Sequence, residues 1–99
     1  MKINFEVDGK TLIVKLDGEL DYDAANDLKE SLSGRLKNIW ELVYDFEKLD
    51  YTSSAGIRIL LENELLFKER GGLRFRNVNE TIMKVFTMVG LDKVFIFED

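Results

Sequence analysis

The chain has 99 residues, of which 45% are hydrophobic and 33% are charged, a size and balance that suit one folded domain with a single core. Its net charge of −5 and its pI of about 4.8 disfavour nucleic acid and anionic membrane surfaces as partners, because like charges repel. Cysteine and histidine are both absent, which excludes disulfides, thiolate chemistry and every nucleophile that histidine activates.

The first half of the chain predicts a hairpin, a helix and a central strand. Residues 3–8 and 11–16 alternate apolar and polar side chains, and Asp8-Gly9 between them is a turn dipeptide. Gly18-Glu19-Leu20-Asp21 then breaks the second strand, and Asp21 or Asp23 can cap a helix. Its apolar positions have helical spacing and are Ala25, Leu28, Leu32 and Leu36. Residues 39–46 form a nearly continuous apolar run, typical of a strand that is buried on both faces.

The second half predicts two further helices that alternate with short strands. A helix should begin near Ser54 or Ala55 and reach about Arg70, before Gly71-Gly72. Residues 73–76 and 94–97 are typical of strands, and Asn79 can cap a helix that Gly90 ends. The order predicts an α/β fold with a mixed β-sheet, in which an opening hairpin precedes βα units and helices pack on the sheet.

The most informative segment is the hydroxyl-rich stretch from residue 50 to residue 58. Thr52, Ser53 and Ser54 lie between a buried strand and a long helix, where side-chain oxygens meet the free amides of a helix N-terminus. In the simplest interpretation, one of the three caps the helix and the others are turn residues. In the functional interpretation, a phosphate on Ser54 would interact favourably with the positive end of the helix dipole, so that the fold could carry the modification.

Three landmarks make the chain similar to a known family. Gly18-Glu19-Leu20-Asp21, the segment from Ser53 to Arg58 and the late Val89-Gly90-Leu91 have the order and approximate spacing of the STAS domain of anti-sigma-factor antagonists. The resemblance covers nearly the whole chain and implies a STAS-like fold. It also implies a protein that binds a cognate anti-sigma factor, often itself a serine kinase, is switched off when that partner phosphorylates it, and is restored by a serine phosphatase.

The same resemblance implies roles for individual residues. Aligned on Gly56, the phosphoacceptor serine of the family falls on Ser54, its preceding aspartate on Ser53 and its second serine on Ala55. Asp21 matches an aspartate implied in partner contact and phosphorylation. Because Ser53 replaces a carboxylate, Ser53 and Thr52 are competing acceptors. The residues expected to contact the partner are Asp21, Thr52, Ser53, Gly56, Ile57 and Arg58.

Two rival functions stay open at this point. STAS-like subunits also serve as adaptors in transporters and in lipid-transport ATPase complexes, and the loss of the aspartate before Ser54 keeps this alternative open. A small serine-based enzyme is the second rival, and it would need Lys48 or Lys84 as its base because histidine is absent.

The helix after Ser54 carries more apolar residues than one buried face needs. Ile57, Leu60, Leu61 and Leu65 form the predicted buried stripe, whereas Ile59, Leu66 and Phe67 fall outside it. Part of this surface could contact a partner or a second copy of the chain in a weak homodimer.

No segment approaches the roughly 20 apolar residues that a membrane-spanning helix requires. We therefore expect residues 1–99 to form one soluble domain, and the absence of cysteine suits the cytoplasm. The resemblance implies a binding module that is not an enzyme, and we expect neither cofactor nor metal.

Overall fold

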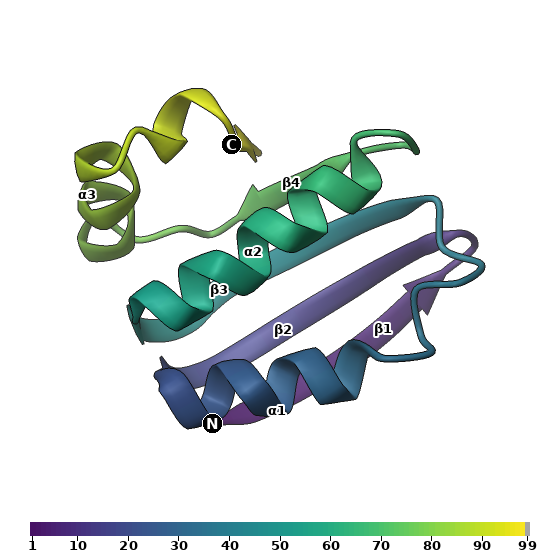
Figure 1. Ribbon diagram of the computed structural model, residues 1–99, viewed down its shortest axis with the longest axis horizontal. Coiled ribbons are helices and arrows are strands. Elements are labelled where there is room, and N and C mark those ends of the chain that lie inside the picture. Colours follow the sequence, from purple (N-terminus) through teal and green to yellow (C-terminus); the bar gives the residue numbers. More distant parts are fainter. Residues whose placement is uncertain (99) are drawn as a thin grey trace.

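The computed structural model describes residues 1–98 and contains a five-stranded sheet with helices (Figure 1). The elements in chain order are β1 (Lys2–Asp8), β2 (Thr11–Leu20), α1 (Tyr22–Leu32), β3 (Glu41–Thr52), α2 (Ser54–Phe67), β4 (Leu73–Arg76), α3 (Glu80–Met88), the 3-10 helix η1 (Leu91–Lys93) and β5 (Ile96–Phe97). The predicted α/β order is thereby confirmed.

The sheet is mixed and has the strand order β1-β2-β3-β4-β5. β1 pairs antiparallel with β2 across a turn in which Gly9 has φ +63°, and all later pairs are parallel. β3 is the central strand, and residues 42–46 are buried on both of its faces, as the apolar run predicts.

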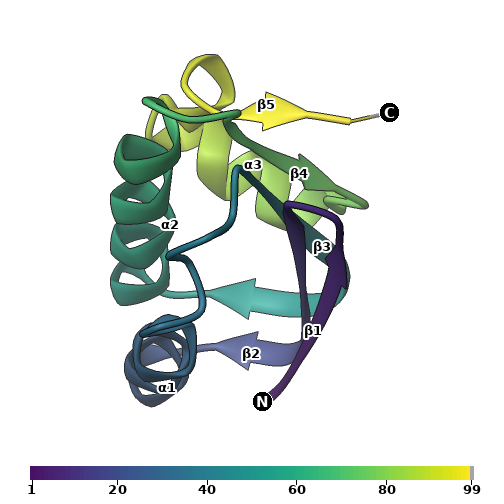
Figure 2. The same cartoon turned by 90° about the vertical axis from the view of Figure 1, so that its right-hand side faces the viewer.

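The core lies between the helices and one face of the sheet. Figure 2 shows α1 and α2 stacked on the same side of the strands. One continuous cluster joins side chains from β2, β3 and β4 with the buried faces of all three helices; its members include Leu12, Leu16, Tyr44, Phe46, Phe75, Leu28, Leu60 and Phe86.

The opposite face of the sheet carries paired charges instead of helices. Arg74 contacts Glu41 at 2.7 Å and also pairs with Glu98, and Arg76 donates to Asp45 at 3.2 Å. Burial raises the pKa of Asp45, but hydrogen bonds from Asn77, from a backbone amide and from Arg76 outweigh it and hold that pKa below its usual value. This face therefore carries ion pairs whose arginines are partly exposed, whereas Asp45 of the central strand is buried.

Several predicted boundaries were wrong, and the largest differences are in β2 and β3, which are longer than predicted. β2 continues through Gly18 to Leu20 because two irregularities in its pairing with β3 accommodate the segment that was expected to break it. β3 likewise runs to Thr52 instead of stopping at residue 46, because Leu20 pairs with Thr52. The last strand shrinks to Ile96–Phe97 because the amides of Val94 and Phe95 both donate to the Leu91 carbonyl and form the turn that follows η1.

Both long helices end earlier than predicted. α1 stops at Leu32 because Gly34 follows with φ +81°, and Leu36 packs against the core from a turn. α2 stops at Phe67, and Arg70 instead donates two hydrogen bonds to the loop carbonyls of Leu36 (2.6 Å) and Ile39 (2.9 Å).

The buried face of α2 also differs from the prediction. Ile59 and Phe67 are buried, whereas Leu65 is 68% exposed, because α2 turns one side toward α1 as well as toward the sheet. Leu66 is exposed, as expected from its position outside the predicted buried stripe. Trp40 precedes β3 and is 54% exposed, so it is not part of the buried strand.

Candidate functional site

The starts of α1 and α2 lie side by side because the two preceding strands end in register. Leu20, the last residue of β2, pairs with Thr52, the last residue of β3. The Ser53 amide continues this pairing and donates to the Leu20 carbonyl at 2.9 Å. The two helices therefore begin at the same edge of the sheet, where parallel α/β sheets place their sites.

The three consecutive hydroxyls have three different environments. Thr52 is buried and donates to the Ser53 carbonyl at 3.2 Å. Ser53 is the N-cap of α2: its Oγ accepts from the Gly56 amide at 3.1 Å and donates to the Leu20 carbonyl at 3.0 Å. Ser54 is exposed, and within residues 1–98 its hydroxyl makes no hydrogen bond to another protein group. Of the three, Ser54 alone is both accessible and uncommitted.

Gly56 sets how closely α2 approaches the sheet. A Cβ atom built on Gly56 would lie 2.6 Å from Thr52 Oγ1 and 2.7 Å from Leu20 Cγ, closer than real carbon contacts allow. Because Gly56 has no side chain, the first turn of α2 can lie directly against the ends of β2 and β3.

The exposed Ser54 lies at one end of a groove of about 400 Å³ between α1 and α2. Ala55 and Arg58 of α2 line it on one side, and Ile59 forms part of its floor. The other side belongs to α1, and the residues are Tyr22, Ala25, Asn26 and Lys29. Lys29 and Glu62 bridge the groove with an ion pair of 3.8 Å. Ile57, which precedes Arg58 in α2, is half-buried and does not line the groove.

The start of α2 carries no negative charge of its own. α1 has Asp23 and α3 has Glu80 in the first turn, where a carboxylate offsets the positive end of the helix dipole. The first turn of α2 has no acidic residue, and Arg58 follows one turn later. An added anion at Ser54 would therefore meet a favourable local field.

Asp21 lies close to this site but does not line the groove. Its Oδ1 accepts from the Ala24 amide at 2.9 Å and caps α1, and its side chain borders a separate acidic hollow with Glu19 and Asp50. The next residue, Tyr22, lines the groove with an exposed ring and was missed by the sequence analysis. The sequence offered only an aromatic residue directly after a predicted cap, and neither the exposure of Tyr22 nor its position beside α2 could be read from it.

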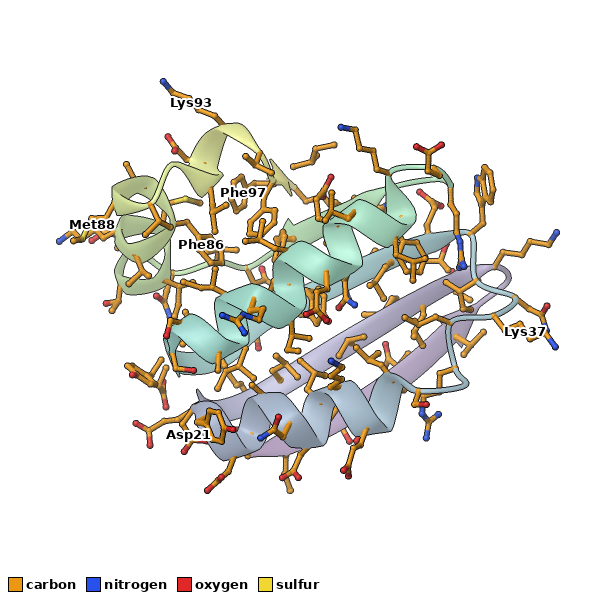
Figure 3. The ribbon with its side chains drawn as sticks, viewed as in Figure 1. Asp21, Lys37, Phe86, Met88, Lys93 and Phe97 are labelled. Atoms are coloured by element: carbon orange, nitrogen blue, oxygen red, sulfur yellow. The ribbon has the colours of Figure 1, made fainter. Side chains whose placement is uncertain are left out.

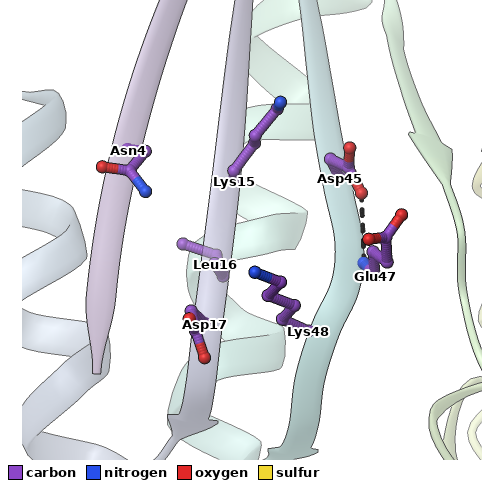
Figure 4. Close-up of a pocket in the computed structure, with 7 residues that line it drawn as sticks. All are labelled: Asn4, Lys15, Leu16, Asp17, Asp45, Glu47 and Lys48. Atoms are coloured by element: carbon purple, nitrogen blue, oxygen red, sulfur yellow. Dashed lines mark hydrogen bonds between the residues drawn. The ribbon is translucent and has the colours of Figure 1, made fainter.

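Neither lysine of the enzyme hypothesis lines the groove of Ser54. Lys48 borders a different hollow on the helix-free face of the sheet, together with Asn4, Asp17 and Asp45 (Figure 4). Lys84 is exposed on α3. The cations that do line the Ser54 groove are Lys29 and Arg58.

Two other kinds of feature are absent from residues 1–98. None of the helices there is long and apolar enough to cross a membrane. The acidic side chains of the same residues form no cluster of three that could hold a metal ion.

The fold and site define a small α/β domain that presents a surface hydroxyl between two helix starts. Residues 2–99 match the model of the STAS domain family, and the chain belongs to that family. Among its relatives is the anti-sigma F factor antagonist of Paenibacillus polymyxa, which is 25% identical over 97 residues, covering 95% of this chain and 83% of the relative.

Solved structures agree with this fold. The anti-sigma factor antagonist SpoIIAA in its unphosphorylated form superposes with a TM-score of 0.77 at 22% identity, covering 99% of this chain and 88% of that one. The phosphorylated form of SpoIIAA from Bacillus gives 0.76 at 24% identity, covering 99% and 92%. A sulfate transporter family protein from Wolinella succinogenes gives 0.77 at 16% identity, covering 93% and 80%. At these identities the superpositions establish the fold alone.

Proposed function

We propose that this chain is an anti-sigma-factor antagonist that binds a cognate anti-sigma factor and is switched off by phosphorylation of Ser54. The observation that carries the proposal is the exposed, unbonded Ser54 hydroxyl at the first position of α2, beside the start of α1. Membership of the STAS family and a relative that is an anti-sigma F factor antagonist support the same function. In this proposal the chain is a cytoplasmic binding module and not an enzyme.

The partner surface would consist of the two helix starts and the groove between them. Tyr22, Ser54 and Arg58 are exposed and supply the contacts, and Ile57 adds a half-buried apolar edge. Thr52 and Gly56 are buried, so they support this surface from below instead of touching a partner. Asp21 would contribute mainly by holding the start of α1 in place.

A phosphate at this position would change the surface without unfolding the helix. It adds a charge of about −1.5 to −2, which the positive end of α2 accommodates. The cap is unaffected, because Ser53 and not Ser54 satisfies the Gly56 amide. A partner surface that fits a neutral hydroxyl would have to desolvate the new charge without compensation, and the complex would dissociate.

Phosphosite mapping with matched variants tests the assignment. The protein is incubated with the anti-sigma factor kinase of the same genome and ATP, and modified residues are located by mass spectrometry. We expect a single phosphoserine at Ser54, which Ser54→Ala abolishes. Ser53→Asn is the matched control, since asparagine is an equally good N-cap and removes the competing hydroxyl. Phosphate at residue 53 or 52 would refute the assignment.

The sulfate transporter family neighbour favours a second candidate, an adaptor domain of a transporter or of a lipid-transport ATPase that is not phosphorylated. Co-purification from the native cell separates the two functions. An anti-sigma factor recovered with the chain supports the first function, and a transporter subunit supports the second.

A further inference from the structure

The end of the molecule that lies far from Ser54 carries a second exposed surface. β3 runs from Glu41 to Thr52, so Trp40 precedes the strand at one end and Ser54 follows it at the other. Figure 3 shows Asp21 and Lys37 at these opposite ends. The surface around Trp40 is an open hollow of about 470 Å³, here called the Trp40 surface, and it is lined by Lys10, Lys37, Asn38, Ile39, Trp40 and Arg70.

Trp40 is exposed and yet firmly held. Its amide donates to the Lys10 carbonyl at 2.7 Å, and its carbonyl accepts from the Gly71 amide at 2.8 Å. The indole also packs directly on Gly71, where an added Cβ would lie 2.5 Å from Trp40 Cδ1. Arg70 fixes the adjoining loop through the carbonyls of Leu36 and Ile39. A rigid, half-exposed tryptophan is the kind of side chain that anchors protein interfaces at low entropic cost.

The Trp40 surface is basic on a chain that is acidic overall. Lys10, Lys37 and Arg70 line it, and no carboxylate does. Lys10 and Lys37 are exposed and, like most lysines within residues 1–98, have no carboxylate partner, so their charges are available to a ligand. Although the whole chain has a net charge of −5, Lys10 and Lys37 make the surface beside the exposed indole locally positive, and a locally positive surface favours a partner segment of the opposite sign.

From this arrangement we infer that the Trp40 surface is a second protein-docking site, and that its occupant is an acidic polypeptide segment with an apolar side chain for the indole. Carboxylates of the segment pair with Lys10 and Lys37, and its apolar side chain covers Trp40. A phosphate-rich ligand fits less well, because it brings no apolar side chain to cover the exposed indole of Trp40. A second copy of the chain could place its acidic Asp21 end on the Trp40 surface, but its own Trp40 surface would then be free to bind a third copy. Such a contact builds open chains instead of a closed dimer, so a second copy is the less suitable occupant.

Nuclear magnetic resonance can test the site directly, because Trp40 is the single tryptophan and gives one indole signal. The full chain is titrated with a synthetic peptide that contains glutamates and two leucines, and then with the same peptide carrying lysine in place of glutamate. We expect the acidic peptide to shift the Trp40 indole signal and the amides of Lys10 and Lys37, and to leave Ser54 unchanged. Binding should weaken with added salt.

Charge reversal supplies the matched control. The double variant Lys10→Glu with Lys37→Glu should weaken binding of the acidic peptide at least tenfold. Lys84→Glu with Lys93→Glu changes the net charge equally on exposed residues of α3 and η1, and it should change binding less than twofold. Equal binding by both double variants, or equal shifts with the lysine peptide, would overturn the inference. Indole shifts caused by protein concentration alone would instead identify a second copy as the occupant and overturn it too.

Discussion

The starts of α2 and α3 are built alike and differ at two positions, the first and the third helical residue. In each helix an N-cap side chain accepts the amide of the third helical residue: Ser53 accepts from Gly56, and Asn79 accepts from Ile82 at 2.8 Å. Each cap also donates to a strand carbonyl, Ser53 to Leu20 and Asn79 to Leu49. Capping is therefore a structural device common to both helices.

The differences lie at the first and third helical residues. α3 begins with Glu80, which supplies its own negative charge, whereas α2 begins with the neutral Ser54. At the third position α3 has the buried Ile82, whereas Gly56 brings α2 directly onto Thr52 and Leu20. The comparison teaches that a cap alone does not indicate a site. A free hydroxyl on an uncharged helix start, held tightly against the sheet, is what distinguishes α2.

The largest expected effect is at the third helical residue. Gly56→Ala should destabilise the protein by about 1–3 kcal/mol, because the new methyl group would overlap Thr52 and Leu20. Thr81→Ala, at an exposed position in the first turn of α3, should stay within about 0.5 kcal/mol. Urea denaturation of both variants measures the difference, and equal stabilities would mean that α2 does not need its close approach.

The caps should have intermediate and similar effects. Ser53→Ala and Asn79→Ala should each cost about 1–2 kcal/mol, because each loses an amide acceptor and a donor to a strand carbonyl. Ser54→Ala should change stability by less than about 0.5 kcal/mol, since its hydroxyl bonds to no protein group within residues 1–98. A larger loss at Ser54 than at Ser53 in denaturation experiments would reverse the assignment of the cap.

The smallest expected effect concerns charge at the first helical residue. Ser54→Glu should stabilise the protein by about 0.3–1 kcal/mol, because it gives α2 the charge that α3 already has in Glu80. Glu80→Gln should lose a similar amount. Thermal denaturation at low salt measures both changes, and they should shrink together when salt is added. Destabilisation by Ser54→Glu would show that the start of α2 does not accommodate an anion.

Much of the fold was predictable from the sequence because its signals are local. Asp8-Gly9 between two alternating segments predicted the hairpin, the apolar run over residues 39–46 predicted the central strand, and Asn79 was identified as a cap from its residue type and position. The start of α2 was predicted near Ser54 or Ala55 from the run of hydroxyl residues before it, and α2 begins at Ser54.

The sequence analysis failed where neighbours distant in the chain decide the outcome. β2 continues past Gly18 because β3 pairs with it, and Gly18 takes φ +118° at that irregular position. Leu65 is exposed because α2 turns toward α1, and Tyr22 enters the site because the two helix starts are neighbours. None of these pairings is visible in a local pattern of residues.

The most direct test of the central claim is the affinity of the cognate anti-sigma factor for the unmodified and the Ser54-phosphorylated protein, measured by isothermal titration calorimetry. We predict that phosphorylation weakens binding at least tenfold, as expected for an uncompensated charge of about −1.5 to −2 in a desolvated interface, and that Ser54→Ala binds like the unmodified protein. Equal or tighter binding by the phosphorylated protein would contradict the account.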